Sequence, residues 1–411
     1  MMNLKLKRIV GCFSIFVCVF AFLFVGFVEA TSVSTVSVGG MPYALAVTPD
    51  GSFVYVPNGE DVAVIDTATS KVVERVNVGV NPSDVAVSPN GEYVYVTNRD
   101  FDGEGSVSVI RVATNTVTST IVVGGDPLFV VVSSDGLYVY VLKSEFVDVG
   151  GGYYQSFGVV SVVSTATHSV LSNITVGRGP SGLAVSPDGN HLYVTTVEGL
   201  LFVVDPSLKT ETASITVSDA GLRDVVVSPD GKYVYVVGFM AVFVVSTESD
   251  AVVAVVSDLG APMGLALSTD GDYVYVTENW NNTVSAINTA TNLVDFSIDA
   301  GVVPYGVVVS PDGKYLYVSN LDYVATDSPV VTYVGTVSVI STDPDVFVFG
   351  SSSIWLWVVI VMCAVVVAAV AFLVIIRIKC KKTKTAFSTN SNINNNVITK
   401  PQLISQFCVF V

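Results

Sequence analysis

The chain has 411 residues, 51% of them hydrophobic, and a formal net charge of −16. Residues 31–350 carry 34 acidic residues and 10 basic ones, so this region repels nucleic acids and anionic membranes and favours cations or basic partners. The same region contains no cysteine, and its stability must come from its core and topology rather than from disulfides. We therefore expect no nucleic-acid partner.

Residues 1–30 have the features of a secretory signal peptide. Lys5, Lys7 and Arg8 form a positive start, an apolar run follows from Ile9 to about Val28, and Ala30 ends a small-residue cleavage site. The apolar run is longer than usual, so an uncleaved signal anchor is the alternative. Either interpretation predicts export of the region that follows.

A four-residue turn signal recurs seven times in that region, at intervals of 40 to 53 residues. The copies are Thr48–Gly51, Ser88–Gly91, Ser133–Gly136, Ser186–Gly189, Ser228–Gly231, Ser268–Gly271 and Ser310–Gly313. Three read Ser-Pro-Asp-Gly, in which proline presets φ and glycine takes the positive φ of a tight turn, and each of the other four differs from it at one position. The interval is the period of a four-stranded propeller blade.

The segments around each turn repeat as well. A proline stands six residues before the turn in six of the seven copies, and a short apolar segment such as Ala44–Val47 lies between them. The turn is followed by a second strand-like segment, for example Tyr93–Val96 in the second repeat. A third segment then follows, as at Val62–Ile65 in the first repeat, and a more polar fourth one, as at Val72–Val76. Four strands in each of seven repeats predict an all-β, seven-bladed β-propeller over residues 31–343.

The two ends of the repeat region explain how such a ring closes. The seventh repeat contains three strand-like segments, at about 304–310, 315–319 and 335–341, and no fourth. Ser32–Gly39, which precedes the first repeat, resembles the fourth strands of the other repeats. We predict that this N-terminal strand completes the last blade and removes an open sheet edge.

Three short motifs carry a resemblance to a known family. They are Tyr95-Val96-Thr97-Asn98, Ile65-Asp66-Thr67-Ala68-Thr69 and Val123-Gly124-Gly125-Asp126-Pro127. With the seven registered repeats, the chain resembles the YVTN family of β-propeller repeat proteins, typical of archaeal and bacterial cell surfaces and surface layers. The resemblance implies the fold and an exported location; it implies no particular activity, because propellers host unrelated functions.

Two connections between second and third strands are much longer than the others, and we expect loops there, at Lys143–Phe157 and Leu321–Val334. Long loops with aromatic residues on a rigid ring are frequent sites of recognition. The candidate residues for an unknown protein or carbohydrate partner are Tyr153, Tyr154, Phe157, Trp280, Tyr323 and Tyr333. The alternative is that these are tolerated insertions whose aromatic rings fold over the base of the loop.

A second candidate site lies just after the repeated prolines, at positions that we expect to surround the channel mouth. These positions include Tyr43, Asp84, Arg223, Asp224 and Tyr305. Arg223 suits an anion or a carboxylate, because its guanidinium is a fixed donor. The alternative for Arg223 is a structural pairing with Asp224 or with a neighbouring blade.

Residues 100–104 alternate carboxylates at Asp100, Asp102 and Glu104, which suits calcium, although the number of ligands is low and a solvated acidic turn is the alternative. Asn173 and Asn281 begin Asn-X-Thr sequons and are candidate glycosylation sites.

Catalysis and cofactors are not expected. The chain contains two histidines, His168 and His191, and neither lies near the other in the repeat register. The sequence offers no clustered metal ligands, nucleophile with a base, or phosphate-binding loop of the kind that enzymes need.

The C-terminal region predicts a membrane anchor. A stalk, residues 344–353, leads to an apolar segment at 354–376, which at roughly 1.5 Å per residue spans about 34 Å as a helix. The basic residues from Arg377 to Lys384 mark the cytoplasmic side, and residues 377–411 form a basic, asparagine-rich tail that we expect to be disordered.

We therefore expect a single-pass cell-membrane protein with an extracellular propeller that acts in binding, adhesion or envelope structure. The alternative is an exported ligand-binding or enzyme-like propeller that uses its channel mouth.

Overall fold

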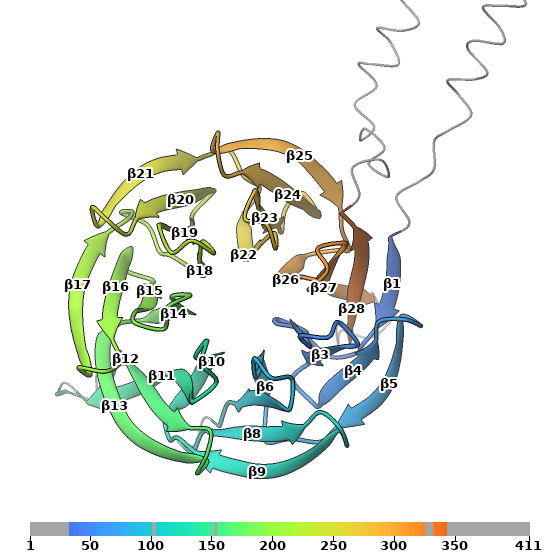
Figure 1. The fold of residues 1–411 in the computed structure, drawn as a ribbon, viewed down its shortest axis with the longest axis horizontal. Coiled ribbons are helices and arrows are strands. Elements are labelled where there is room, and N and C mark those ends of the chain that lie inside the picture. Colours follow the sequence, from blue (N-terminus) through green and yellow to red (C-terminus); the bar gives the residue numbers. More distant parts are fainter. Residues whose placement is uncertain (1–32, 101–103, 149, 152–153, 325–331, 343–411) are drawn as a thin grey trace, which may run out of the picture. The chain divides into compact units, whose positions relative to one another are not determined.

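The structure, a computed structural model, describes residues 33–100, 104–148, 150–151, 154–324 and 332–342. Its strands form seven four-stranded antiparallel sheets, arranged as a closed ring of blades (Figure 1). The predicted all-β, seven-bladed propeller is therefore confirmed. No helix within the described ranges is long and apolar enough to cross a membrane. The signal (1–30), stalk (344–353), predicted helix (354–376) and tail (377–411) lie outside those ranges.

Each blade has four strands, which follow one another from the ring axis outward. Blade one contains β2 (Ala46–Val47), β3 (Phe53–Pro57), β4 (Val62–Asp66) and β5 (Lys71–Val76). Blade two contains β6 (Pro82–Val87), β7 (Tyr93–Asn98), β8 (Ser106–Arg111) and β9 (Thr116–Val122). Blade three contains β10 (Asp126–Val132), β11 (Tyr138–Asp148), β12 (Tyr154–Ser164) and β13 (Ser169–Arg178). Blade four contains β14 (Pro180–Val185), β15 (Leu192–Thr196), β16 (Leu200–Asp205) and β17 (Thr210–Thr216).

The remaining three blades continue the ring. Blade five contains β18 (Val225–Val227), β19 (Tyr233–Gly238), β20 (Ala241–Ser246) and β21 (Ala251–Val256). Blade six contains β22 (Pro262–Leu267), β23 (Tyr273–Glu278), β24 (Thr283–Asn288) and β25 (Leu293–Asp299). Blade seven contains β26 (Pro304–Val309), β27 (Tyr315–Val324), β28 (Thr332–Ser341) and β1 (Ser34–Ser37).

Burial follows the position of a strand in its blade. Val54, Tyr55 and Val56 of the second strand β3 are completely buried, because neighbouring blades cover both faces of the sheet. In the fourth strand β9, by contrast, Ile121 is the only buried side chain and most of the others are exposed. The apolar core therefore lies between blades, which explains why the second and third strands read as nearly continuous valine, isoleucine and tyrosine.

The repeated turn is stabilised by its own side chains. In blade five, Ser228 Oγ donates to Asp230 Oδ1 (2.7 Å) and accepts a hydrogen bond from the Tyr233 amide (2.9 Å). Gly231 has a φ of 71°, which glycine adopts without strain. Pro229 of this turn also contacts Gly271 of the next blade, where a Cβ would lie 3.4 Å from the ring. The turn signal thus specifies both a hairpin and a contact between blades.

The ring closes where it was predicted to close. Strand β1 pairs with β28 in antiparallel register, with Val36 opposite Val337, and becomes the outer strand of blade seven. Val36 and Val38 are buried in the core between blades seven and one. Closure therefore satisfies the outer edge of β28 and joins the two ends of the described chain (Figure 1).

The Thr-Asn end of the YVTN motif links strands and blades. Asn98 Oδ1 accepts a hydrogen bond from the Gly79 amide (3.0 Å), and its Nδ2 donates to Ser108 Oγ (3.0 Å). A Cβ on Gly79 would lie only 2.6 Å from Asn98 Cγ, so glycine is required for this approach. Asn320 makes the same pair of contacts with Gly301 and Ser338 in blade seven.

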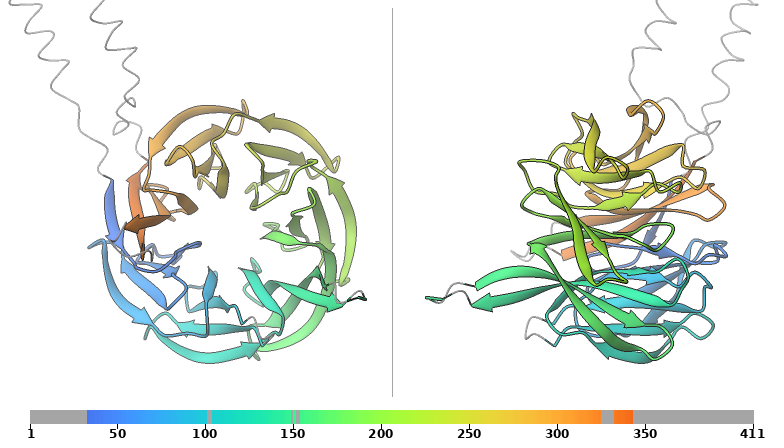
Figure 2. Two further views of the ribbon diagram at one scale, coloured as in Figure 1. Left: turned by 180° about the vertical axis from the view of Figure 1, so that it is seen from behind. Right: turned by 60° about the vertical axis from the view of Figure 1, so that its left-hand side comes forward.

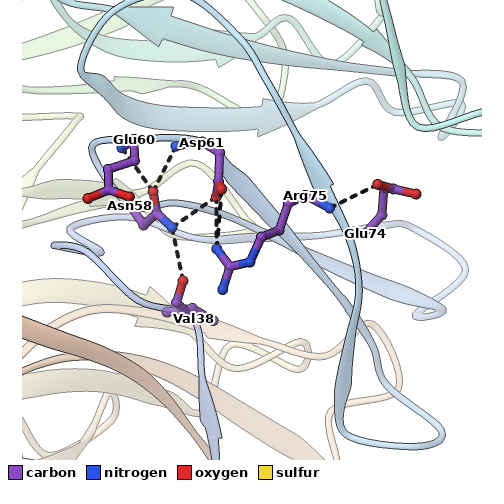
Figure 3. A network of polar contacts seen from close by, with 6 residues as sticks. All are labelled: Val38, Asn58, Glu60, Asp61, Glu74 and Arg75. Atoms are coloured by element: carbon purple, nitrogen blue, oxygen red, sulfur yellow. Dashed lines mark hydrogen bonds and ion pairs between the residues drawn. The ribbon is translucent and has the colours of Figure 1, made fainter.

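Blade one has an elaborated version of this contact (Figure 3). Asn58 Nδ2 donates to the Val38 carbonyl (2.9 Å) and to Asp61 Oδ1 (2.9 Å), and Arg75 Nη1 lies 3.0 Å from the same carboxylate. Figure 3 shows Asp61 between Asn58 and Arg75, so its carboxylate connects the residue after β3 with β5, and Asn58 in turn bonds the segment after β1. The signature asparagine is therefore a structural residue.

Candidate binding face

The ring has two faces, because successive connections in an antiparallel blade lie at opposite ends of the sheet. We call the side with the Ser-Pro-Asp-Gly turns and the connections between third and fourth strands the turn face. The opposite side, with the connections between second and third strands and from blade to blade, is the hairpin face. Val33 precedes the fourth strand of blade seven and Thr342 follows its third, so both ends of the described chain lie at the turn face. The Thr342 amide accordingly donates to the Lys314 carbonyl beside the last turn (2.8 Å).

The turn face is acidic. A turn aspartate occurs in six of the seven blades, and these residues are Asp50, Asp135, Asp188, Asp230, Asp270 and Asp312. The hydroxyl of the first turn residue donates to each of them and lowers the pKa of the carboxyl, for Asp230 to about 2. The turn face therefore keeps its negative charge into acidic solution.

The hairpin face carries exposed apolar side chains in four consecutive blades. We call them the apolar arc: Phe146 (64% exposed), Tyr154 (67%), Val197 (58%), Phe239 (62%) and Trp280 (62%). Exposed apolar side chains in neighbouring blades suit an interaction surface, and the arc differs from the turn face, where Leu137, Leu208 and Leu293 are also exposed, in that most of its members are aromatic. Sequence reasoning selected Tyr154 and Trp280 only, although Val197 and Phe239, like Trp280, lie in a connection between the second and third strands of a blade.

Blade three corrects the expectation of a loop at Lys143–Phe157. Most of that segment continues β11 and β12 as a two-stranded ribbon that projects from the hairpin face (Figure 2). Phe146, Val147, Tyr154 and Phe157 are aromatic or β-branched, residue types that favour strands, so the ladder extends beyond the blade.

The aromatic residues of this ribbon have different environments. Phe146 pairs with Ser156 and Asp148 with Tyr154, which places the Phe146 and Tyr154 rings on one face. Phe157 lies at the base, with the Arg178 guanidinium carbon 5.4 Å from its ring centroid, and is half-buried. Tyr153 lies outside the described residues.

Blade seven also replaces an expected loop, Leu321–Val334, with strand. β27 continues to Val324 and β28 begins at Thr332, with Tyr323 directly opposite Tyr333 in the register. Residues 325–331 lie outside the described residues. Tyr323 and Tyr333 therefore occupy paired positions in the two strands of one hairpin.

Trp280 and the adjacent sequon lie in the tight connection between β23 and β24. The Trp280 amide donates to the Gly260 carbonyl (3.0 Å), which holds the backbone while the ring stays exposed. Asn281 Nδ2 donates to the buried Glu278 carboxylate (2.7 Å), which also accepts from the Gly260 amide (2.6 Å).

Asn173, on outer strand β13, is exposed and accepts a hydrogen bond from Ser161. Asn173 thus has the more suitable environment for a glycan.

The residues expected at the channel mouth fall into two groups. Tyr43 and Tyr305, from blades one and seven, pack edge to face with ring centroids 5.2 Å apart. Arg223 is exposed and its Nη1 lies 3.1 Å from Met263 Sδ of blade six. Among the described residues no ion pair joins Arg223 to Asp224, so Arg223 contacts the neighbouring blade instead.

Asp84 and Asp224 link inner strands of adjacent blades. Asp84 Oδ2 accepts a hydrogen bond from the Val130 amide of blade three (2.8 Å), and Asp224 Oδ2 accepts one from the Leu265 amide of blade six (2.7 Å). Desolvation raises the pKa of Asp84 to about 7 and that of Asp224 to about 6. The charge of Asp224 also contributes to the raised pKa of Asp84, after desolvation.

The calcium candidate remains untested, because Asp102 lies outside the described residues. Glu104 is exposed and its backbone forms an isolated bridge with Gly125. Within the described ranges, no group of three or more His, Cys, Asp or Glu side chains could hold a metal ion.

Comparisons with known proteins support the fold. No protein-family model matches the chain, and no curated protein matches it by sequence. A chain of hydrazine synthase from Kuenenia stuttgartiensis is similar in structure, with a TM-score of 0.62, 25% identity, and coverage of 77% of this chain and 99% of that one. The Cps50 (Swd1) β-propeller domain of Myceliophteria thermophila has a TM-score of 0.58 and 12% identity, with coverage of 75% and 100%.

Proposed function

We propose that this protein is a YVTN-type propeller, anchored in the cell membrane with its ring outside, that binds a protein or carbohydrate partner through the hairpin face. The observation that carries the proposal is the apolar arc, from Phe146 to Trp280, on the face opposite both ends of the described chain. Aromatic rings on rigid connections suit both sugars and protein surfaces, because they bury a large area with little loss of conformational entropy.

The topology gives this proposal a direction. The predicted membrane segment begins at residue 354, twelve residues after Thr342, which lies at the turn face. Because both ends of the described chain lie at the turn face, no chain end interrupts the hairpin face. Binding, adhesion or a structural role in the envelope would all use the hairpin face, and none of them requires catalysis or a cofactor.

A second candidate function is ligand binding at the predicted channel mouth. The observation that favours it is the raised pKa of Asp84 and Asp224, since perturbed carboxylates gather at functional sites. Both carboxylates also make hydrogen bonds between blades, which gives them a structural role. The similarity to a hydrazine synthase chain supports an enzyme-like function no further than the shared propeller.

The test is a glycan and protein array probed with the full chain in detergent, with and without calcium. We expect specific binding that falls at least roughly tenfold in Tyr154→Ala and Trp280→Ala, a loss of about 1.4 kcal/mol or more. Tyr233→Ala and Tyr315→Ala remove exposed tyrosines that flank turns on the other face, and they should bind normally. Binding lost instead in Arg223→Ala would support the channel mouth, and no binding at all would favour the structural envelope role.

A further inference from the structure

The blade-three ribbon has an open sheet edge. Strand β10 pairs with β11 only as far as Ser144, opposite Asp126. Beyond that point β11 continues through Glu145, Phe146, Val147 and Asp148, and no described strand pairs with its β10 side there. An unpaired edge presents a row of backbone donors and acceptors to any extended chain.

The register shows which backbone N–H and C=O groups of β11 point toward its open, β10 side. Tyr138 directs its amide and its carbonyl toward the β10 side, since the amide donates to Ser133 Oγ and the carbonyl accepts from the Ser133 amide. The ladder between β11 and β12 runs without a bulge, so every second residue has the same direction. The N–H and C=O groups of Phe146 and Asp148 therefore face the open edge.

The side chains beside this edge combine apolar rings with negative charge. Phe146, Asp148 and Tyr154 share one face of the ribbon and are exposed. Glu145 is compensated by the Lys143 ammonium at 2.8 Å, whereas among the described residues Asp148 receives only the Gly150 amide (2.8 Å). A carboxylate next to two aromatic rings suits a lysine or arginine side chain, which gains from both charge and ring.

We propose that the open edge of β11 on its β10 side, at Phe146 and Asp148, binds an extended peptide segment that carries basic side chains, by addition of a strand to the ribbon. This inference rests on the proposed function, because it names the partner class for part of the hairpin face. Main-chain hydrogen bonds would supply the affinity, and a basic side chain beside Asp148 would supply the specificity.

Charge favours a basic partner over a second copy of the chain. Residues 31–350 carry 34 acidic and 10 basic residues, so two copies repel each other at long range. Antiparallel pairing of two β11 edges would also bring two Asp148 carboxylates near one another, while the ammonium of Lys143 is already engaged by Glu145 and the Val123 carbonyl. A second copy is therefore the disfavoured occupant.

The test uses fluorescent twelve-residue peptides of alternating lysine and valine, titrated against the full chain in detergent at about 50 mM salt. The comparison peptides replace lysine with glutamate, or N-methylate alternate backbone amides while keeping the charge. We expect saturable binding of the lysine peptide and at least tenfold weaker binding of the other two. Phe146→Pro removes the outward donor, and because that amide makes no bond to β12 the ribbon should keep its fold.

Phe146→Ala is the matched control, since it removes the ring but keeps the amide. Phe146→Pro should bind the lysine peptide at least tenfold more weakly than Phe146→Ala, with equal melting temperatures, and Asp148→Asn should also weaken binding. Equal binding of N-methylated and unmethylated peptides, or equal binding by the proline and alanine variants, would overturn strand addition. A partner found on the array that depends on Trp280 and not on Phe146 would leave the proposed function standing and reject only this inference.

Discussion

Asn98 has several hydrogen-bond partners in a site where only 2% of its surface is exposed. Its oxygen accepts from the Gly79 amide, and its nitrogen donates to Ser106 and Ser108. The last residue of the YVTN motif thus holds the connection into blade two against the second and third strands of that blade. A motif of this kind determines how the blades pack and does not determine what the surface of the ring binds.

Removal of this side chain should therefore cost stability. Asn98→Ala leaves the Gly79 amide and the Ser108 hydroxyl without their partner in a buried site, which costs about 2 kcal/mol. Urea unfolding followed by circular dichroism measures the loss. Asn190→Ala, at an exposed turn position, is the control and should change the free energy of unfolding by less than about 0.5 kcal/mol. Equal effects of the two changes would contradict the role assigned to Asn98.

Asp84 predicts an unusual pH dependence. Its pKa rises from 3.8 to about 7 on folding, so the folded state favours the protonated form and loses stability as pH rises between those values. Asp84→Asn keeps an acceptor for the Val130 amide without the charge. The substitution should raise the melting temperature at pH 8 and have a much smaller effect, or none, at pH 4.5. The same shift at both values would mean that Asp84 is not a desolvated carboxyl.

Strand β1 shows what the sequence could predict at the scale of an element. A missing fourth strand in the last repeat and a spare one before the first repeat predict that the spare strand completes the last blade, and the structure confirms this, with Val36 opposite Val337. The extension of β11 and β12 was not predicted, because glycines and aromatics in Lys143–Phe157 suit a loop as well as a ribbon. Strand propensity shows that residues can pair, whereas the length of a ladder depends on the partner strand.

Val197 and Phe239 of the apolar arc were not predicted as exposed, because residue type alone does not show exposure. Val197 and Phe239 are ordinary core residues by composition, and only their place at a connection between second and third strands exposes them. Trp280 was selected because tryptophan is rare in this region. A comparison of the connections between second and third strands, rather than attention to residue type, would have found all three.

Ring closure by β1 predicts which side chain of that strand contributes to the stability of the fold. Val36 is 6% exposed and packs with Val54 and Val337, so Val36→Ala should cost about 2 kcal/mol through lost burial and a small cavity. Thr35→Ala, on the exposed side of the same strand, should be nearly neutral. Thermal unfolding of both variants measures the difference. If Thr35→Ala destabilised the chain as much as Val36→Ala, the strand would not close the ring through its buried face.

At the scale of the molecule, the two faces have different chemistry. The turn face carries aspartates such as Asp230 whose pKa is lowered by turn hydroxyls, so they stay charged. The hairpin face carries the apolar arc, with Trp280 and Tyr154 among its members, and the open edge of β11. A ring with both chain ends on one face has the other face available for a partner, whatever anchors it.

The most direct test asks which side of the membrane the ring occupies. All five cysteines lie outside the described residues, at 12, 18, 363, 380 and 408, so a single new thiol in the ring reports its own location. Glu198→Cys on the hairpin face and Lys232→Cys on the turn face would be treated, in intact cells, with a maleimide that cannot cross membranes. We predict labelling of both variants before lysis, with the unsubstituted chain as the blank. Labelling only after the cells are opened would place the propeller inside and contradict the proposed function.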